Sequence, residues 1–191
     1  MTVAIEFLHP LEGDVPPPSE SHRERLEGVS KCLRSARSLD EAFDLLGQLL
    51  CRDIPFDRLA LAALTDGGHQ LTALRVQSTH ALRWEAGDSR PLLGSSLEPM
   101  LREHALRIIH DLKAYQTLRP SSLSTKRLIE EGMRSSLTSP IYRGDQPLGV
   151  LFLTHSQPDA YQAEHAGLLA ALAPALDETF SRLIPAPSLA D

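Results

Sequence analysis

The sequence of 191 residues is poor in cysteine, aromatic residues and lysine, and it contains no long apolar run. Two cysteines, Cys32 and Cys51, cannot build the disulfide framework of a small secreted domain. No segment approaches the roughly 20 apolar residues that cross a bilayer. The first ten residues lack the basic flank and apolar core of a signal peptide. These absences predict a cytoplasmic protein with no membrane partner.

Positive charge is also scarce. The chain has 19 Lys and Arg residues against 25 Asp and Glu, a formal net charge of −6, whereas nucleic-acid binding rests on basic side chains that neutralise phosphates. We therefore expect no nucleic-acid partner. Only Lys31, Lys113 and Lys126 are lysines, and this bias toward arginine hints at a GC-rich bacterial genome.

What the chain does have is aliphatic. Hydrophobic residues make up 42% of the sequence and aromatic residues only 5%, and a chain of this length buries roughly 70% of its unfolded surface. Residues 14–18 (DVPPP) predict that 1–18 is a disordered or extended lead-in. We expect one domain over 19–184, followed by a tail over 185–191, with a core that needs no disulfide or metal.

Apolar spacing and capping signals predict the elements of this domain. Ser21 with Glu24, and Ser38 with Glu41, have the spacing of capping boxes before helical apolar patterns. Shorter apolar runs bounded by turn residues predict strands. The expected helices are 21–36, 39–52, a short one near 97–105, another within 112–132, and 163–183; the expected strands are 59–64, 71–79, 106–109, 135–142 and 147–154.

This order predicts an α+β domain with a central, mostly antiparallel sheet. Helices from both ends of the chain would cover one face. The loops and short helices of 80–132 would cover the other face, where irregular cover leaves room for a ligand pocket. Pro174 lies inside the last predicted helix and is either a hinge or a tolerated bend.

Several strings resemble the GAF domain family, a small-molecule-sensing module of signalling proteins. Residues 131–141 (EGMRSSLTSPI) and 143–153 (RGDQPLGVLFL) are similar to its G-x-R-S-x-L-x-x-P-L strand, hairpin turn and x-x-G-V-L-x-L strand. Gly94, 107–112 (RIIHDL) and 161–169 (YQAEHAGLL) resemble further parts in the same order. Over about 38–183 the resemblance implies a profilin-like, PAS-related sheet, a pocket under 80–132 and a dimer through the terminal helices.

Candidate ligand-binding residues gather around this presumed pocket. Ser136 and Thr138 share a strand face where the family is usually aliphatic, so their hydroxyls either bind a polar ligand or bond to neighbouring backbone. Trp84 is a lid over a flat ligand or a plug for a small core. Tyr115 and Arg119 would roof the pocket, where Arg119 either pairs with an anionic ligand or lies in solvent.

Two further candidates close the short strand that ends at residue 109. His110 and Asp111 would lie beside the cavity, with Asp111 favoured as the N-cap of the following helix over an acid catalyst. A metal or haem ligand at His104 or His110 is the alternative to a capping or surface histidine. Since no two of the eight histidines have the spacing of a preorganised metal site, no metal or catalytic residue is assigned.

The cysteines decide the expectation about catalysis. Some GAF proteins reduce free methionine sulfoxide with cysteines in the loops over the pocket, and phytochrome-like members attach a bilin there. Residues 80–132 contain no cysteine, and Cys32 and Cys51 fall in the predicted N-terminal helices. The Asn-Lys-Phe-Asp-Glu string of cyclic-nucleotide-binding members is absent as well. The chain is therefore not expected to be an enzyme, and its cofactor stays unknown.

The resemblance thus implies a sensory or regulatory domain that binds a small molecule and signals through dimeric terminal helices. Its partner would be a signalling protein such as a kinase or a transcription regulator. Whether the chain stands alone or is part of a longer protein is open. The alternative is a degenerate domain, with its pocket filled by Leu and Ala, that only dimerises or acts as a scaffold.

Overall fold

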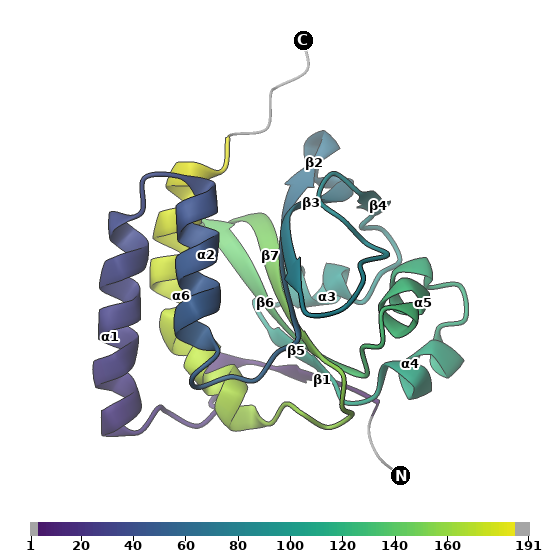
Figure 1. The fold of residues 1–191 in the computed structure, drawn as a ribbon, viewed down its shortest axis with the longest axis horizontal. Helices are drawn as coiled ribbons and strands as arrows, with labels where there is room; N and C mark the ends of the chain where they lie inside the picture. The colour runs from purple at the N-terminus through teal and green to yellow at the C-terminus, as the bar shows by residue number, and fades with distance from the viewer. Residues whose placement is uncertain (1–3, 186–191) are drawn as a thin grey trace.

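A seven-stranded antiparallel sheet separates two layers of helices in the computed structural model, which describes residues 4–185 (Figure 1). The strand order is β1-β5-β6-β7-β2-β3-β4. The strands are β1 (Ile5–Leu8), β2 (Arg58–Thr65), β3 (Gln70–Ser78), β4 (Ser89–Pro91), β5 (Leu106–Ile109), β6 (Ser135–Arg143) and β7 (Gln146–His155). The helices are α1 (Glu20–Ser35), α2 (Leu39–Leu50), α3 (Leu97–Arg102), α4 (Leu112–Leu118), α5 (Leu123–Glu130) and α6 (Ala163–Leu183). The predicted α+β class is confirmed.

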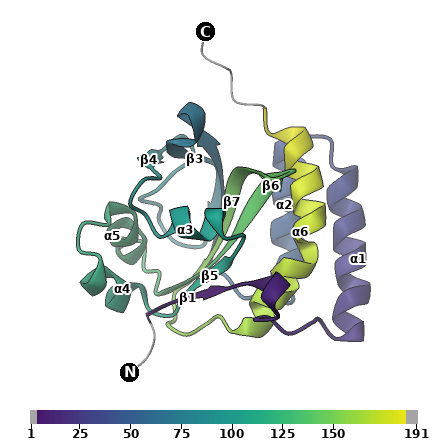
Figure 2. The same cartoon turned by 180° about the vertical axis from the view of Figure 1, so that it is seen from behind.

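The three long helices cover one face of the sheet (Figures 1 and 2). Their apolar stripes, among them Leu33 of α1 and Leu46 of α2, join Leu61 and Leu151 of the sheet in the largest buried cluster. Ser38 caps α2 as predicted, because its Oγ accepts from the backbone N of Glu41 at 3.1 Å. The α1 cap is Ser19, not Ser21. Within the described residues, no helix combines the length and apolar character that crossing a membrane requires.

The central strands read as continuous apolar runs because both of their faces are covered. Leu59 and Leu61 of β2 face the long helices, while Ala60 and Ala62 face the opposite layer. That second layer consists of α3, α4, α5 and the connecting loops, as Figure 2 shows from behind. The prediction that residues 80–132 cover this face is confirmed.

The N-terminal segment differs from the predicted lead-in. Ile5–Leu8 forms β1, an edge strand that pairs antiparallel with β5. Val15 packs against the main core, and a Cβ added at Gly167 of α6 would lie 2.3 Å from the Pro16 carbonyl oxygen. The segment is therefore part of the fold and not a separate extension, because the sheet edge and α6 bind it. Residues 1–3 and 186–191 of the predicted lead-in and tail lie outside the described residues.

The pairing of β7 with β2 leaves no room for a side chain at Gly149. A Cβ there would lie 2.3 Å from the backbone oxygen of Ala62. We expect Gly149→Ala to lower the free energy of unfolding by about 1–3 kcal/mol in urea denaturation, since the backbone must shift. At Gly28, an exposed position of α1, an added Cβ meets no atom within 4 Å. Gly28→Ala should therefore raise the free energy of unfolding by about 0.5–1 kcal/mol. Equal stability of the two variants would contradict the crowding at β7.

Candidate functional site

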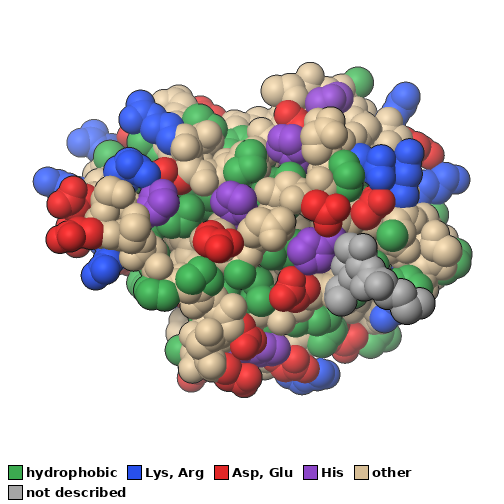
Figure 3. Space-filling view, turned by 90° about the horizontal axis from the view of Figure 1, so that it is seen from below, with side chains coloured by type: hydrophobic (Ala, Val, Ile, Leu, Met, Phe, Trp, Pro, Cys, Tyr) green, Lys and Arg blue, Asp and Glu red, His purple; other side chains and the backbone are tan. Residues whose placement is uncertain are grey.

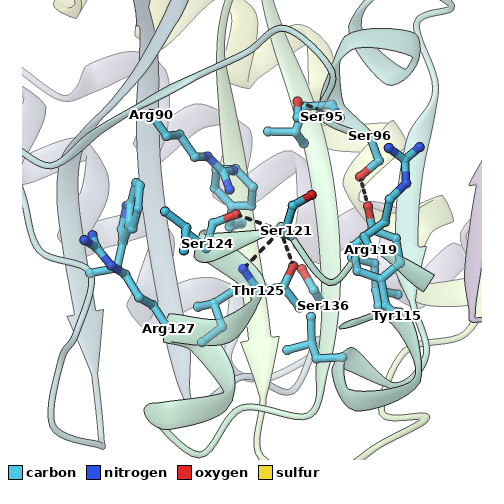
Figure 4. Close-up of a pocket in the computed structure, with 18 of the residues that line it drawn as sticks. Arg90, Ser95, Ser96, Tyr115, Arg119, Ser121, Ser124, Thr125, Arg127 and Ser136 are labelled. Atoms are coloured by element: carbon cyan, nitrogen blue, oxygen red, sulfur yellow. Dashed lines mark hydrogen bonds between the residues drawn. The ribbon is translucent and has the colours of Figure 1, made fainter. Parts of the chain in front are cut away.

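A cavity of about 380 Å³ lies between the sheet and the second helical layer (Figure 4). This volume falls within the range of small-molecule pockets. The lining residues come from β4, β5, β6 and β7, from α3, α4 and α5, and from the loops that join them. The cavity is therefore where the family resemblance placed a pocket.

The lining is rich in hydrogen-bond donors and in positive charge. Its arginines are Arg90, Arg107, Arg119 and Arg127, and its hydroxyl residues are Ser89, Ser95, Ser96, Ser121, Ser122, Ser124, Thr125 and Ser136. No Asp or Glu is among the lining residues that the structure describes. The cavity thus carries positive charge in a protein whose net charge is −6.

Strand alternation places Arg107 in the floor of the cavity. Arg107 and Ile109 of β5 line it, while Ile108 between them packs into the core on the other face. The Arg107 guanidinium donates from Nη1 to Ser96 Oγ at 2.7 Å and from Nη2 to Thr138 Oγ1 at 3.0 Å. The Tyr115 hydroxyl donates to the same Ser96 oxygen at 2.8 Å. Four elements are joined around one guanidinium.

Arg107 has no carboxylate partner among residues 4–185. Arg107 is only 6% exposed, and its Nε atom is buried without a hydrogen-bond partner among the described residues. Burial lowers the pKa of Arg107 to about 10, so that it remains protonated at neutral pH. A buried charge without an opposite charge is costly to keep.

Arg90 lies against aromatic rings instead of a carboxylate. Its guanidinium carbon is 5.4 Å from the ring centre of Phe152 and 5.5 Å from that of Trp84. Arg127 is 5.0 Å from the same Trp84 ring. Burial, followed by the charges of Arg107 and Arg58, lowers the pKa of Arg90 to about 9. Cation–π contacts stabilise both guanidinium groups in part. Arg127 also lies 3.9 Å from Asp88 Oδ2, whereas Arg90 has no such carboxylate among the described residues.

A buried ion pair fixes the loop that carries Trp84. Arg58 Nε of β2 lies 2.8 Å from Glu131 Oε2, and both side chains are almost fully buried. The other oxygen, Oε1, accepts from the backbone N atoms of Arg83 and Trp84, each at 2.7 Å. Arg58 Nη2 in turn donates to the Trp84 carbonyl at 3.0 Å. One carboxylate therefore ties the loop to the end of α5 and to the sheet.

The structure brings four of the seven predicted site residues to the cavity: Trp84, Tyr115, Arg119 and Ser136. Thr138 is not among the lining residues; it lies behind Arg107 and accepts from it. Arg119 is exposed at the rim, with one long hydrogen bond to the Gly94 carbonyl at 3.4 Å. Ser136 thus lines the cavity, while Thr138 accepts a hydrogen bond from the side chain of Arg107 and not from neighbouring backbone.

The predicted placement of His110 and Asp111 beside the cavity is wrong. Ile109 takes the inward position, so His110 lies on the side of β1, where its Nε2 is 3.1 Å from Glu6. Asp111 caps α4 as favoured, accepting from Lys113 N at 3.0 Å, and pairs with Arg134, which lowers the pKa of Asp111. His104 stacks on Tyr142, with ring centres 4.3 Å apart.

Histidines with acidic neighbours recur on the molecular surface, and one face shows several such groups side by side (Figure 3). His155 Nε2, for example, lies 3.8 Å from an oxygen of Asp57. Neither His104 nor His110 lines the cavity, so the two histidines weighed as metal or haem ligands are not directed at it. Cys32 and Cys51 are exposed and also absent from the lining.

Sequence reasoning missed Arg90, Arg107 and Arg127 as cavity residues. Arg107 could have been assigned from its alternation with the core residue Ile108 in LRII. The hydroxyl-rich string at 121–125 (SSLST) was a visible signal too. Arg90 carries no such signal, because its place depends on β4 pairing with the beginning of β3.

A family model described as the GAF domain matches residues 36–177. This chain belongs to the GAF domain family. Among curated protein sequences no significant match was found. The relatives discussed below are therefore solved structures.

Three solved GAF structures share the fold at low sequence identity. The GAF domain of a two-component sensor histidine kinase from Bacillus halodurans is 20% identical, with a TM-score of 0.65, covering 77% of this chain and 96% of that one. The phycoerythrobilin-bound GAF domain of a cyanobacterial phytochrome is 14% identical (TM-score 0.64; 86% and 99% covered). The GAF domain of the Acinetobacter phosphoenolpyruvate-protein phosphotransferase is 16% identical (TM-score 0.65; 86% and 95% covered).

The Glu131 network makes a direct prediction for this GAF domain. Glu131→Gln leaves Arg58 buried without its partner and should lower the free energy of unfolding by about 3–5 kcal/mol. Because Trp84 is the only tryptophan, its fluorescence should shift to longer wavelength as the loop becomes hydrated. Glu130→Gln, at the exposed neighbouring position, should change neither property. Unchanged stability and emission in Glu131→Gln would contradict the anchoring role.

Proposed function

We propose that this GAF domain is a non-enzymatic sensory or regulatory module that binds a small molecule in the cavity under α3, α4 and α5. The observation that carries the proposal is the cavity itself, about 380 Å³ in volume and lined by hydroxyl and guanidinium groups. A degenerate scaffold would fill this space with Leu and Ala. A concave space with a few buried, convergent polar groups is the usual geometry of a small-molecule site.

The relatives support a sensory role by analogy. One neighbour is the bilin-bound GAF domain of a phytochrome and another belongs to a sensor histidine kinase. By this analogy, a signalling protein such as a kinase or transcription regulator is the proposed partner. The position of both cysteines outside the cavity lining supports a binding role over thiol chemistry.

Strand β6 offers a physical route from the cavity to the terminal helices. Ser136, near the start of β6, lines the cavity. At the other end, Tyr142 N donates to Asp177 Oδ1 of α6 at 2.8 Å, and Arg143 donates to the Ser181 carbonyl at 2.8 Å. A shift of β6 on ligand binding would therefore move α6, the helix through which signalling is proposed.

Ligand binding is testable by thermal denaturation in a library of metabolites. A molecule present at about 100 times its Kd should add about 2.7 kcal/mol and raise Tm by roughly 5–10 °C. Ser124→Trp, which fills the rim from α5, should abolish the shift. Ser21→Trp, at an exposed position of α1, is the control and should leave the thermal shift unchanged. A library without a single shift, or shifts that Ser124→Trp leaves intact, would sink the proposal.

Dimerisation through α1 and α6 remains part of the proposal. Leu26 of α1 and Phe180 of α6 are buried within the chain, so a dimer would use the outer surfaces of the two helices. Light scattering of the purified protein should give twice the 21.0 kDa chain mass. Reversing the charge of exposed Arg34 and Glu178, which bridge α1 and α6, leaves the core intact and tests that surface. A monomer mass for the unaltered protein would exclude this route.

A further inference from the structure

We infer that the ligand of this cavity is a small organic anion whose carboxylate or phosphate group is held by Arg107 and Arg90. This inference rests on the proposed ligand-binding function and specifies the chemistry of that same site. It follows from the charges and the unused hydrogen-bond donors of the lining.

Two arginines outside the cavity, Arg58 and Arg134, each have a carboxylate partner. Arg58, nearly fully buried, has Glu131 at 2.8 Å. Arg134 is held by Asp111 through two hydrogen bonds of 3.1 and 2.8 Å. Within residues 4–185, Arg107 and Arg90 have no carboxylate within 4 Å. The fold thus places a carboxylate beside Arg58 and Arg134, and also beside Arg127 at the cavity, where Asp88 lies at 3.9 Å, but not beside Arg107 or Arg90.

The floor of the cavity also has more donors than acceptors. Ser96 Oγ already accepts from Arg107 Nη1 and from the Tyr115 hydroxyl, so its own proton is free to donate. Arg107 Nε is buried without a partner in the described part of the chain. The Arg90 side chain makes aromatic contacts but no hydrogen bond there. Each unmet group needs an acceptor, and a carboxylate or phosphate supplies several.

Charge excludes the opposite ligand class. Arg107 and Arg90, which have no carboxylate within 4 Å among the described residues, repel a cation, and burial strengthens that repulsion because the surroundings screen it poorly. The planar fork of arginine fits the oxygens of carboxylate and phosphate groups. Ile109, Leu112, Leu128 and Phe152 provide apolar wall for the carbon skeleton, which favours an organic anion over an inorganic ion.

The test compares anions with neutral counterparts on the full chain. The probes are succinate against succinamide, glycerol 3-phosphate against glycerol, and inorganic phosphate, each at 20 mM as the chosen dose and matched in ionic strength with sodium chloride. We expect at least one organic anion to raise Tm above the chloride control and its neutral counterpart not to. The carboxylate and phosphate arms distinguish the two sources of the anionic group. Binding is then quantified by calorimetry.

Three variants assign the effect to the cavity. Arg107→Gln and Arg90→Gln should each weaken binding of the anion at least tenfold. Arg90→Gln keeps the test open if Arg107→Gln does not fold, since the Arg90 side chain makes no hydrogen bond among the described residues. Arg75→Gln, which removes equal charge from a surface pair with Asp40, is the control and should bind as the unaltered chain does.

The outcomes separate this inference from the proposed function. If neutral molecules raise Tm, Ser124→Trp abolishes that shift, and no anion raises Tm, then the ligand is not an anion but the proposed sensory function stands. Anion binding that Arg107→Gln and Arg90→Gln leave unchanged would overturn the assignment to these side chains. No shift with any anion beyond chloride would overturn the inference outright, whatever the metabolite library shows.

Discussion

The cover of the second sheet face depends on one buried carboxylate. Residues 79–134 contain only short elements, and such a segment has too little regular structure to bury a continuous apolar stripe of its own. Glu131 compensates by binding Arg58 of β2 and the backbone of Arg83 and Trp84. Two distant parts of the covering segment are thereby fixed to the sheet. Because water is excluded from this pair, losing either partner costs far more than a surface ion pair would.

This anchoring explains how a cavity persists in a small aliphatic domain. The layer of long helices packs densely against the sheet, as apolar side chains do when they interlock. The opposite layer is attached to the sheet by hydrogen bonds and ion pairs at Glu131 and at the Ser96–Arg107–Tyr115 network. The space between these points is bounded by polar groups that face inward. The same interactions that hold the cover therefore hold the donors in place for a ligand.

The distribution of charge separates structural arginines from those proposed to bind. Arg58 and Arg134 each have a carboxylate close by, so their electrostatic needs are met by the fold. Arg90 and Arg107 have only hydroxyl groups and aromatic rings. The domain carries a net charge of −6, so a positive cavity inside it is a local arrangement that composition conceals. The unpaired charges of Arg90 and Arg107 lower the stability of the fold at the cavity where ligand binding is proposed.

Local pattern determined the α+β class, the antiparallel sheet, the helices near 20–35, 39–50 and 163–183, and the cap at Asp111, because each depends on neighbours a few residues apart. It also determined which segment covers the second face. Only the tertiary structure decided that Ile109 faces inward and His110 outward, that β1 completes the sheet edge, and that Arg90, Arg107 and Arg127 meet in one cavity. These outcomes depend on strand register and on contacts between residues far apart in the chain, and no local spacing encodes those.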